Sequence, residues 1–393
     1  MENSSSGLMK VAKYVVIVLI VITIIVILVF EYKKYSKNKD KCSNIESVYA
    51  NKIKITQPSN DKQTKATLCS PLKKVAIMGS YNSCAVENFC YSYVDTCSLS
   101  KWIKLGIRAV DFEIYSKNGE PVIAVSSDDS YCLKNSYNSI QLKDALKVIS
   151  TNAFASDQSS MPPFFITLRV KSAIAEIYDK IWQAIVANLS KTLLLCNNQV
   201  DPSIFAKPNT HMTDENTPIL NTQIKTLMNK IIIIFDSTNT QKNSKSFDQI
   251  AGRLSKIIHI YTPVKRFNNI SLSTPLAATS FNVAIPSLGC SATNTVTNSS
   301  NVNLLEKSLN IMHMNFQSFD DSLQKYLDTF KAPANRDQGS GGEYYSMIPL
   351  QTFIQAGGSS DSADGSSSSP GCSIDSMKQA FDNNPGLKSS LGF

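Results

Sequence analysis

The sequence predicts an α/β fold built on parallel strands, with one membrane-spanning helix ahead of it. Between residues 73 and 350, apolar runs of strand length alternate with amphipathic helical patterns, as expected when crossover helices join parallel strands. Several of these runs, such as Ile231–Phe235, are apolar at every position, which is typical of strands covered on both faces in a parallel sheet or a barrel. Ahead of this region, residues 14–30 form one uninterrupted apolar stretch.

The apolar stretch is long enough to cross a membrane. Roughly 17 helical residues rising about 1.5 Å each reach about 26 Å, close to the thickness of a hydrocarbon core. The chain continues Val29-Phe30-Glu31, with no small-x-small cleavage site, so an uncleaved anchor is favoured over a signal peptide or a core helix. The sequence therefore divides into an N-terminal flank (1–13), a transmembrane helix (14–30), a polar basic stalk (31–72), a folded body (73–356) and a disordered Ser/Gly-rich tail (357–393).

The composition is that of a globular protein with a basic cluster beside a membrane span. Of 393 residues, 42% are hydrophobic and 18% are charged, which is enough for a sizeable core, and the net charge is +8. Part of this charge is local, because five lysines crowd residues 33–41 directly after the apolar stretch. Such a cluster is typical of a membrane flank, so we expect no nucleic-acid partner.

The orientation of the anchor has two interpretations. Lys10 and Lys13 precede the apolar stretch and five lysines follow it, so the positive-inside bias places the body on the cytosolic side. Three Asn-x-Ser sequons in the body, at Asn188, Asn269 and Asn298, and nine cysteines would instead suit an exported body. The odd number of cysteines leaves at least one unpaired in a monomer. The sequence contains no Cys-x-x-Cys pair, so a zinc site is not expected.

The candidate elements of the body follow in chain order. Strands are predicted at Val75–Met78, Ala109–Tyr115, Pro121–Val125, Phe164–Val170, Ile231–Phe235, Ile257–Tyr261, Phe281–Ile285 and Leu309–Asn315. Helices are predicted at Leu142–Phe154, Ala173–Leu195 and Phe319–Phe330. Ser318 supplies a hydroxyl cap and Asp320 and Asp321 supply first-turn acids at the start of the last helix.

Four segments of the body carry motifs in a fixed order. They are Met78-Gly79-Ser80-Tyr81-Asn82-Ser83; Gly106-Ile107-Arg108-Ala109-Val110-Asp111-Phe112-Glu113 with Asn118-Gly119-Glu120-Pro121-Val122; Ile140–Leu146 with Phe164–Leu168; and Met314-Asn315-Phe316-Gln317 with Tyr345–Pro349. This series resembles the X region of phosphatidylinositol-specific phospholipase C, and residues 80–83 and 111–115 are similar to the phospholipase-C-like phosphodiesterases of large DNA viruses. The resemblance implies a TIM-type (β/α)8 barrel over residues 73–356.

The resemblance also implies that the acid and base of the reaction are missing. Enzymes of this family use two histidines, one to deprotonate the inositol 2-hydroxyl and one to protonate the leaving oxygen. Tyr81 and Val125 stand at those positions, and neither side chain transfers protons readily near neutral pH. The chain's histidines, His211, His259 and His313, lie in no matching motif, and His259 in its apolar strand is predicted to be a packed core residue.

The family's metal-binding residues are partly present. Asn82, Asp111 and Glu113 could offer oxygen ligands to calcium, but Arg169 stands where the family has a glutamate and disfavours a cation, so we expect no cofactor. Asn82, Arg108 and Arg169 are instead predicted to bind phosphate, because guanidinium groups form bidentate hydrogen bonds with it. The competing interpretation is a structural ion-pair network that closes the barrel mouth.

Three functions are compatible with these residues. The first is a catalytically inactive, membrane-anchored barrel that binds a phosphate-bearing lipid headgroup, such as a phosphoinositide, or acts as a scaffold. The second is a phosphodiesterase of altered, histidine-independent mechanism, with Asp111, Glu113 or Asp128 as base and Arg169 as phosphate clamp. The third is a structural component of a viral or organellar membrane, such as a virion inner membrane, with viral membrane or capsid proteins as partners.

Overall fold

The computed structural model describes most of residues 3–350. The chain forms two units, Met1–Asn44 and Ile45–Phe393. The predicted tail lies outside the described residues. Those residues are 3–39, 41–49, 53–56, 62–87, 93–125, 136–155, 161–192, 218–238, 258–270, 276, 280–287, 298, 305, 308–331 and 343–350.

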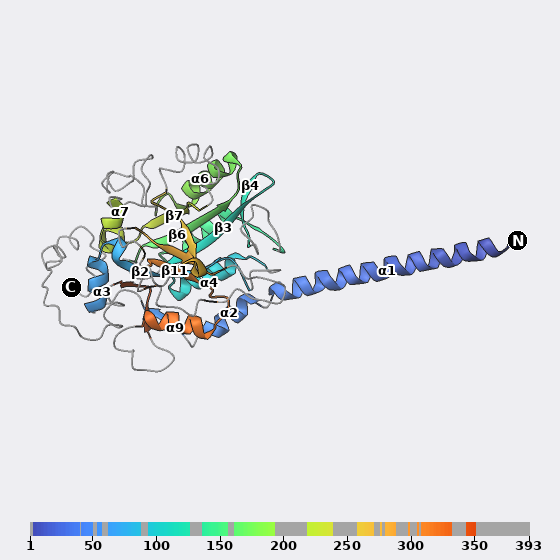
Figure 1. Cartoon of the computed structure of the whole chain (residues 1–393), viewed down its shortest axis with the longest axis horizontal. Helices are drawn as coiled ribbons and strands as arrows, with labels where there is room; N and C mark the ends of the chain where they lie inside the picture. The colour runs from blue at the N-terminus through green and yellow to red at the C-terminus, as the bar shows by residue number, and fades with distance from the viewer. Residues whose placement is uncertain are drawn as a thin grey trace. The chain divides into compact units, whose positions relative to one another are not determined.

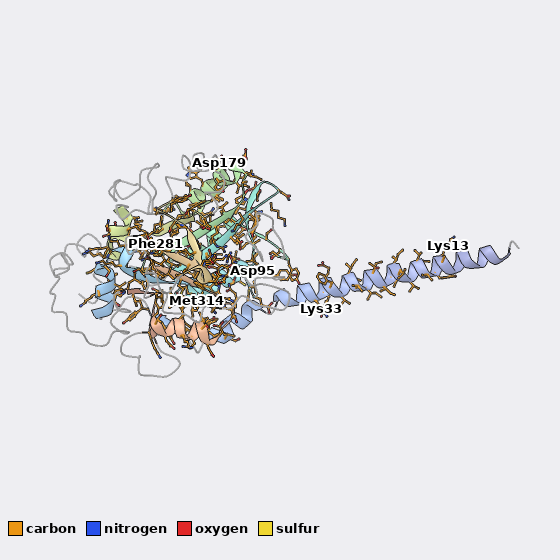
Figure 2. The ribbon with its side chains drawn as sticks, viewed as in Figure 1. Lys13, Lys33, Asp95, Asp179, Phe281 and Met314 are labelled. Atoms are coloured by element: carbon orange, nitrogen blue, oxygen red, sulfur yellow. The ribbon has the colours of Figure 1, made fainter. Side chains whose placement is uncertain are left out.

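The first unit is dominated by one long helix, α1 (Asn3–Lys39). Within it, Ala12–Lys33 is long and apolar enough to cross a membrane, with a mean hydropathy of 3.2 and no part of it buried. Figure 2 labels Lys13 and Lys33 near the two ends of this stretch. The span includes the predicted residues 14–30 and extends them, because helical geometry continues through the flanking polar residues.

The second unit contains a parallel barrel. Eight parallel strands follow one another in the order β8-β7-β6-β3-β2-β11-β10-β9, drawn together at the centre of the body in Figure 1. Their bounds are β2 (Val75–Ser80), β3 (Ala109–Lys117), β6 (Phe164–Lys171), β7 (Ile231–Asp236), β8 (Ile260–Thr262), β9 (Val264–Arg266), β10 (Val283–Ile285) and β11 (Ile311–Met314). The continuous apolar runs are therefore strands covered on both faces, and the predicted barrel is confirmed.

The barrel is nearly closed by a bent segment of chain. Strands β8 and β9 are separated by Pro263 alone, yet β8 pairs with β7 and β9 pairs with β10. Proline lacks a backbone N–H, which suits a point where the pairing changes sides. Asp236 bridges the bend, since its Oδ1 accepts a hydrogen bond of 3.0 Å from the Val264 N–H.

A hairpin and a set of helices complete the barrel. The segment predicted as a strand from Pro121 forms β4 (Glu120–Ile123), which pairs antiparallel with β3 and with β5 (Ile140–Gln141) rather than joining the ring. Four helices pack around the strands: α4 (Thr96–Leu105), which the sequence did not predict, α5 (Leu142–Asn152), α6 (Ala175–Leu189) and α9 (Asp321–Thr329). Asp320, not Ser318, caps α9, because its Oδ1 accepts from the Leu323 N–H at 2.7 Å.

The region predicted as a stalk is folded over most of its length. Ile45, Tyr49 and Ile53 recur every four residues and are buried in a core cluster with Trp102 and Phe316. This segment contains α2 (Lys41–Tyr49), β1 (Lys54–Thr56), which pairs with β12 (Glu343–Tyr345), and α3 (Lys62–Cys69). The unit that contains the barrel includes the chain from Ile45 onward, ahead of the expected boundary at residue 73. A few apolar residues at helical spacing anchored a segment whose average composition is polar.

Candidate functional site

The predicted site residues of β2, β3 and β6 meet at the carboxyl end of the barrel. The parallel register sets Glu113 of β3 opposite Arg169 of β6 and Asp111 opposite Thr167. Asn82 follows β2 in a left-handed turn, with φ of 38°, a conformation that asparagine adopts more readily than most residues. The carboxyl ends of parallel strands therefore bring together the side chains that the sequence motifs singled out.

Arg169 forms a buried ion pair at the centre of this group. Its Nε and Nη2 donate to Asp111 Oδ1 and Oδ2, both at 2.8 Å, in a bidentate arrangement. Nη2 also donates to Asn82 Oδ1 at 2.8 Å and lies 3.6 Å from Glu113 Oε2. All four side chains are at most 2% exposed. The guanidinium thus binds each of the three residues expected to be calcium ligands.

The two carboxylates have further partners of their own. Asp111 Oδ2 accepts the Asn82 backbone N–H at 3.0 Å. Glu113 Oε1 accepts from the Tyr115 hydroxyl at 2.8 Å, and Oε2 accepts from the Asn82 amide at 3.4 Å. With these oxygens engaged and a fixed cation among them, the donor set does not fit a calcium ion, which needs six to eight free oxygen ligands.

The electrostatics keep the ion pair charged. Burial raises the pKa of Asp111, but the charge and hydrogen bonds of Arg169 outweigh it and hold that pKa below its usual value. Burial likewise lowers the pKa of Arg169, while Asp111 and Glu113 hold it well above its usual value. The Nη1 atom of Arg169 is buried and has no hydrogen-bond partner, so the N–H donors on one edge of the guanidinium are unsatisfied.

Tyr81 and Val125, which the resemblance aligns with the family's two histidines, are both buried. Tyr81 is 2% exposed, its ring centroid lies 5.2 Å from the Arg169 Cζ, and burial raises the pKa of its phenol above 10. Val125 is 1% exposed and belongs to the main apolar cluster. The ring of Tyr81 therefore stabilises the Arg169 guanidinium rather than accepting a proton.

His313 is a site residue that the motifs missed. It lies on β11, is fully buried, and its Nε2 is 3.0 Å from Thr167 Oγ1. Burial lowers the pKa of its imidazole to about 4, partly offset by the charge of Asp111. A backbone hydrogen bond with Ser80 also raises this pKa. Ile311 and His313 lie two residues apart on β11, so both face Gly79 inside the barrel, one layer beneath the mouth. This two-residue spacing is the sequence signal that could have placed His313 near the site.

Gly79 makes room for this imidazole. A Cβ added at Gly79 would lie 2.7 Å from His313 Nδ1 and 2.9 Å from Ile311 Cγ2. We expect Gly79→Ala to lower the free energy of unfolding by about 1–3 kcal/mol, as overpacking does in other cores, and to cost less when His313→Ala is also present. Chemical denaturation of the four proteins of this cycle measures the coupling, and fully additive losses would contradict the contact.

Arg108, predicted to share a phosphate site with Arg169, lies at the opposite end of the barrel. It precedes the amino end of β3, and its guanidinium lies 5.2 and 5.1 Å from the ring centroids of Phe154 and Phe164. Its nitrogens donate to three backbone carbonyls, those of Ala153, Pro162 and Pro163. Burial lowers its pKa to about 9. Arg108 therefore satisfies loop carbonyls and contributes nothing to the mouth.

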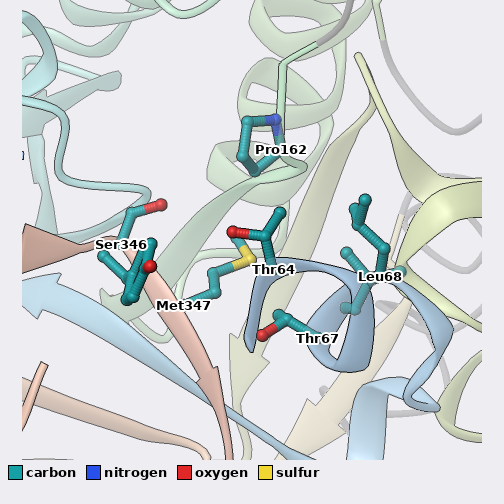
Figure 3. A pocket seen from close by; sticks show the side chains of 8 residues that line it. Thr64, Thr67, Leu68, Pro162, Ser346 and Met347 are labelled. Carbon is teal, nitrogen blue, oxygen red and sulfur yellow. The ribbon is translucent and has the colours of Figure 1, made fainter. Parts of the chain in front are cut away.

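The same amino end holds a small cavity, shown in Figure 3. Its volume of about 20 Å³ suffices for about one water molecule. Its walls come from α3, the segment before β6, the 3-10 turn Ile224–Leu227 and the chain from the end of β12 into the last strand, β13 (Met347–Pro349). The lining residues are Thr64, Thr67, Leu68, Pro162, Ile224, Tyr345, Ser346 and Met347. This cavity is too small for a headgroup and lies away from the charged residues.

The remaining predicted residues are placed as follows. His259 is buried, and its Nδ1 accepts the Ile233 N–H at 2.9 Å, which confirms the predicted core role. His211 and Asp128 lie outside the described residues.

Comparison with known proteins gives a likeness of fold. No protein-family model matches the chain, and no curated protein matches it. Among solved structures, a calcium-dependent phosphoinositol-specific phospholipase C from Pseudomonas sp. is 12% identical, with 72% of this chain and 97% of that chain covered and a TM-score of 0.41. The phosphatidylinositol-specific phospholipase C from Listeria monocytogenes is 12% identical, with 65% and 92% covered and a TM-score of 0.40.

A third solved structure is a longer protein. PLC21 from S. officinalis is 12% identical, with a TM-score of 0.48, over 70% of this chain and only 37% of its own length. The barrel is shown by this chain's own strand order. The three solved structures bear the name of the group that the sequence motifs resemble.

Proposed function

We propose that the protein is a membrane-anchored, non-catalytic barrel of the phospholipase-C-like type that serves as a scaffold. The observation that carries this proposal is the bidentate pair of Arg169 and Asp111, buried where a catalytic metal would lie. The viral setting, a component of a virion membrane with membrane or capsid proteins as partners, rests only on the resemblance of residues 80–83 and 111–115.

The loss of proton transfer supports a non-catalytic role. General acid and base groups each contribute typically about 10²- to 10⁴-fold to rate. Tyr81 has a raised pKa, and Val125 has no titratable group. The neutral imidazole of His313 is hydrogen-bonded to Thr167 beneath the ion pair. The alternative of a carboxylate-based hydrolase is disfavoured for two of its three candidate bases. Asp111 is fixed as the partner of Arg169, and Glu113 accepts hydrogen bonds from Tyr115 and Asn82, while Asp128 lies outside the described residues.

The test is an assay of the full-length protein in nanodiscs that contain phosphatidylinositol. We expect no release of inositol phosphate above a protein-free blank, from pH 5 to pH 8 and with or without calcium. A bacterial phosphatidylinositol-specific phospholipase C in the same nanodiscs shows that the substrate is accessible. Turnover that disappears in Asp111→Asn would overturn the proposal and establish the hydrolase.

Phosphate binding is the second candidate function, and one observation favours it. The buried Nη1 of Arg169 has no partner and is a strong donor for an anionic oxygen. We test it with inositol 1-phosphate and inorganic phosphate added to the full chain in detergent. A saturable rise in unfolding temperature that is absent in Arg169→Met would support binding, and no rise would leave the scaffold role alone.

A further inference from the structure

The described cysteines fall into two chemical groups. Cys42, Cys69 and Cys97 are each disulfide-bonded and partly exposed. Cys84 is free, but it is buried, and burial raises the pKa of its thiol well above the usual range. Because the thiolate is the reactive form of cysteine, this thiol is inert. Every accessible cysteine in the described part of the chain is therefore oxidised.

This pattern bears on the side of the membrane that the body occupies. Disulfides persist in oxidising compartments and are rare where cellular reductants keep thiols reduced. All three bonded cysteines follow α1 in the chain, on the same side of the span as the body. The disulfides therefore oppose the cytosolic placement that the five lysines of residues 33–41 favour. The lysine bias is a tendency, and long domains translocate largely regardless of charge.

We propose that the body lies on the oxidising, non-cytosolic side of its membrane and that Asn269 carries an N-linked glycan there. Asn269 is the last residue of a short 3-10 turn, Phe267–Asn269, on the surface of the body. Its side chain is exposed, and Ile270 and Ser271 complete its sequon. A sugar on this side chain extends into solvent.

The other two sequons of the body are less compatible with a glycan. Asn298 is 7% exposed, and its amide nitrogen donates to the Asn315 carbonyl at 3.0 Å and to Asp320 Oδ1 at 3.1 Å. A glycan there would replace an amide hydrogen and displace the residue that receives the Asn315 N–H at 2.6 Å. Asn188 lies half-buried within α6, its amide bonded to the Ala184 carbonyl at 2.7 Å. The fold therefore accommodates a glycan best at Asn269.

The modification requires an oligosaccharide joined to a lipid carrier through a diphosphate. The Asn269 amide nitrogen forms a bond to C1 of the first sugar as the bond between C1 and the diphosphate oxygen breaks. The lipid diphosphate leaves with that electron pair, and the amide loses one proton. No oxidation or reduction occurs, so no further reactant is needed.

The full chain is expressed in animal cells and its gel mobility compared before and after peptide N-glycosidase treatment. We expect a shift of one glycan in the wild type and in Asn188→Gln, and none in Asn269→Gln or in Ser271→Ala, which removes the sequon while keeping Asn269. An unshifted wild type, or a shift retained in both sequon variants, overturns the proposal. Protease protection of the body in sealed microsomes supports the orientation independently, and digestion of the body overturns it.

Discussion

Replacement of Arg169 by methionine is expected to lower the free energy of unfolding by about 3–5 kcal/mol, the usual cost of removing one member of a buried ion pair. In the variant, Asp111 and Glu113 stay buried beside an apolar side chain. Neither carboxylate then has the cation that it contacts in the wild type. Chemical denaturation of the full chain in detergent, followed by tryptophan fluorescence, measures the loss.

A second variant separates charge from packing. Asp111→Asn in the Arg169→Met background removes one of the two buried carboxylates left without a cation, while an amide oxygen can still accept the Asn82 backbone N–H. We expect this double variant to recover part of the lost stability, because only Glu113 then remains as a buried charge without its cation. A loss below about 1 kcal/mol for Arg169→Met would instead show that water reaches the pair, as in exposed salt bridges.

Acidification is expected to destabilise the protein in two separate pH windows. Burial lowers the pKa of His313 from 6.5 to about 4, so the unfolded chain takes up a proton that the folded chain refuses. At about 1.36 kcal/mol per pKa unit, the free energy of unfolding falls by about 3 kcal/mol between pH 6.5 and pH 4. The lowered pKa of Asp111 adds a second loss only below about pH 4, as its carboxylate is protonated.

His313→Asn isolates the upper window. Asparagine cannot titrate, so the variant should show a much flatter dependence between pH 6.5 and pH 4 and keep the loss at lower pH. Denaturation curves at intervals of half a pH unit give both slopes. An unchanged slope in the upper window would assign it to other groups and would mean that water or a neighbouring side chain solvates the imidazolium of His313.

Patterns of apolar residues predicted the barrel well because they report burial directly. The run Ile231–Phe235 is fully buried as β7, and the alternating acids of β3 reach the mouth as expected. Averages misled where a few residues decide the outcome. The polar region after α1 belongs to the body because Ile45, Tyr49 and Ile53 are all buried in one core cluster, which a mean composition hides.

The site was predictable in membership but not in arrangement. The motifs identified Asn82, Asp111, Glu113 and Arg169, and these do converge. They could not show whether Arg169 would meet a phosphate or its neighbours, because that depends on distances of a few tenths of an ångström across two strands. Arg108 was misplaced because it was grouped with Arg169 by chemistry alone. Its position directly before the strand that begins at Ala109 puts it at the amino end of the barrel.

The strands on either side of Pro263 are held less firmly than the other strands of the barrel. Strands β3 and β6 each pair with neighbours on both sides, whereas β8 and β9 are each held along one edge in the described part of the sheet. Opening of a strand held along one edge breaks fewer hydrogen bonds. Amide hydrogens of residues 260–266 should therefore exchange with solvent sooner than those of β3, which makes this seam the place where the ring first comes apart.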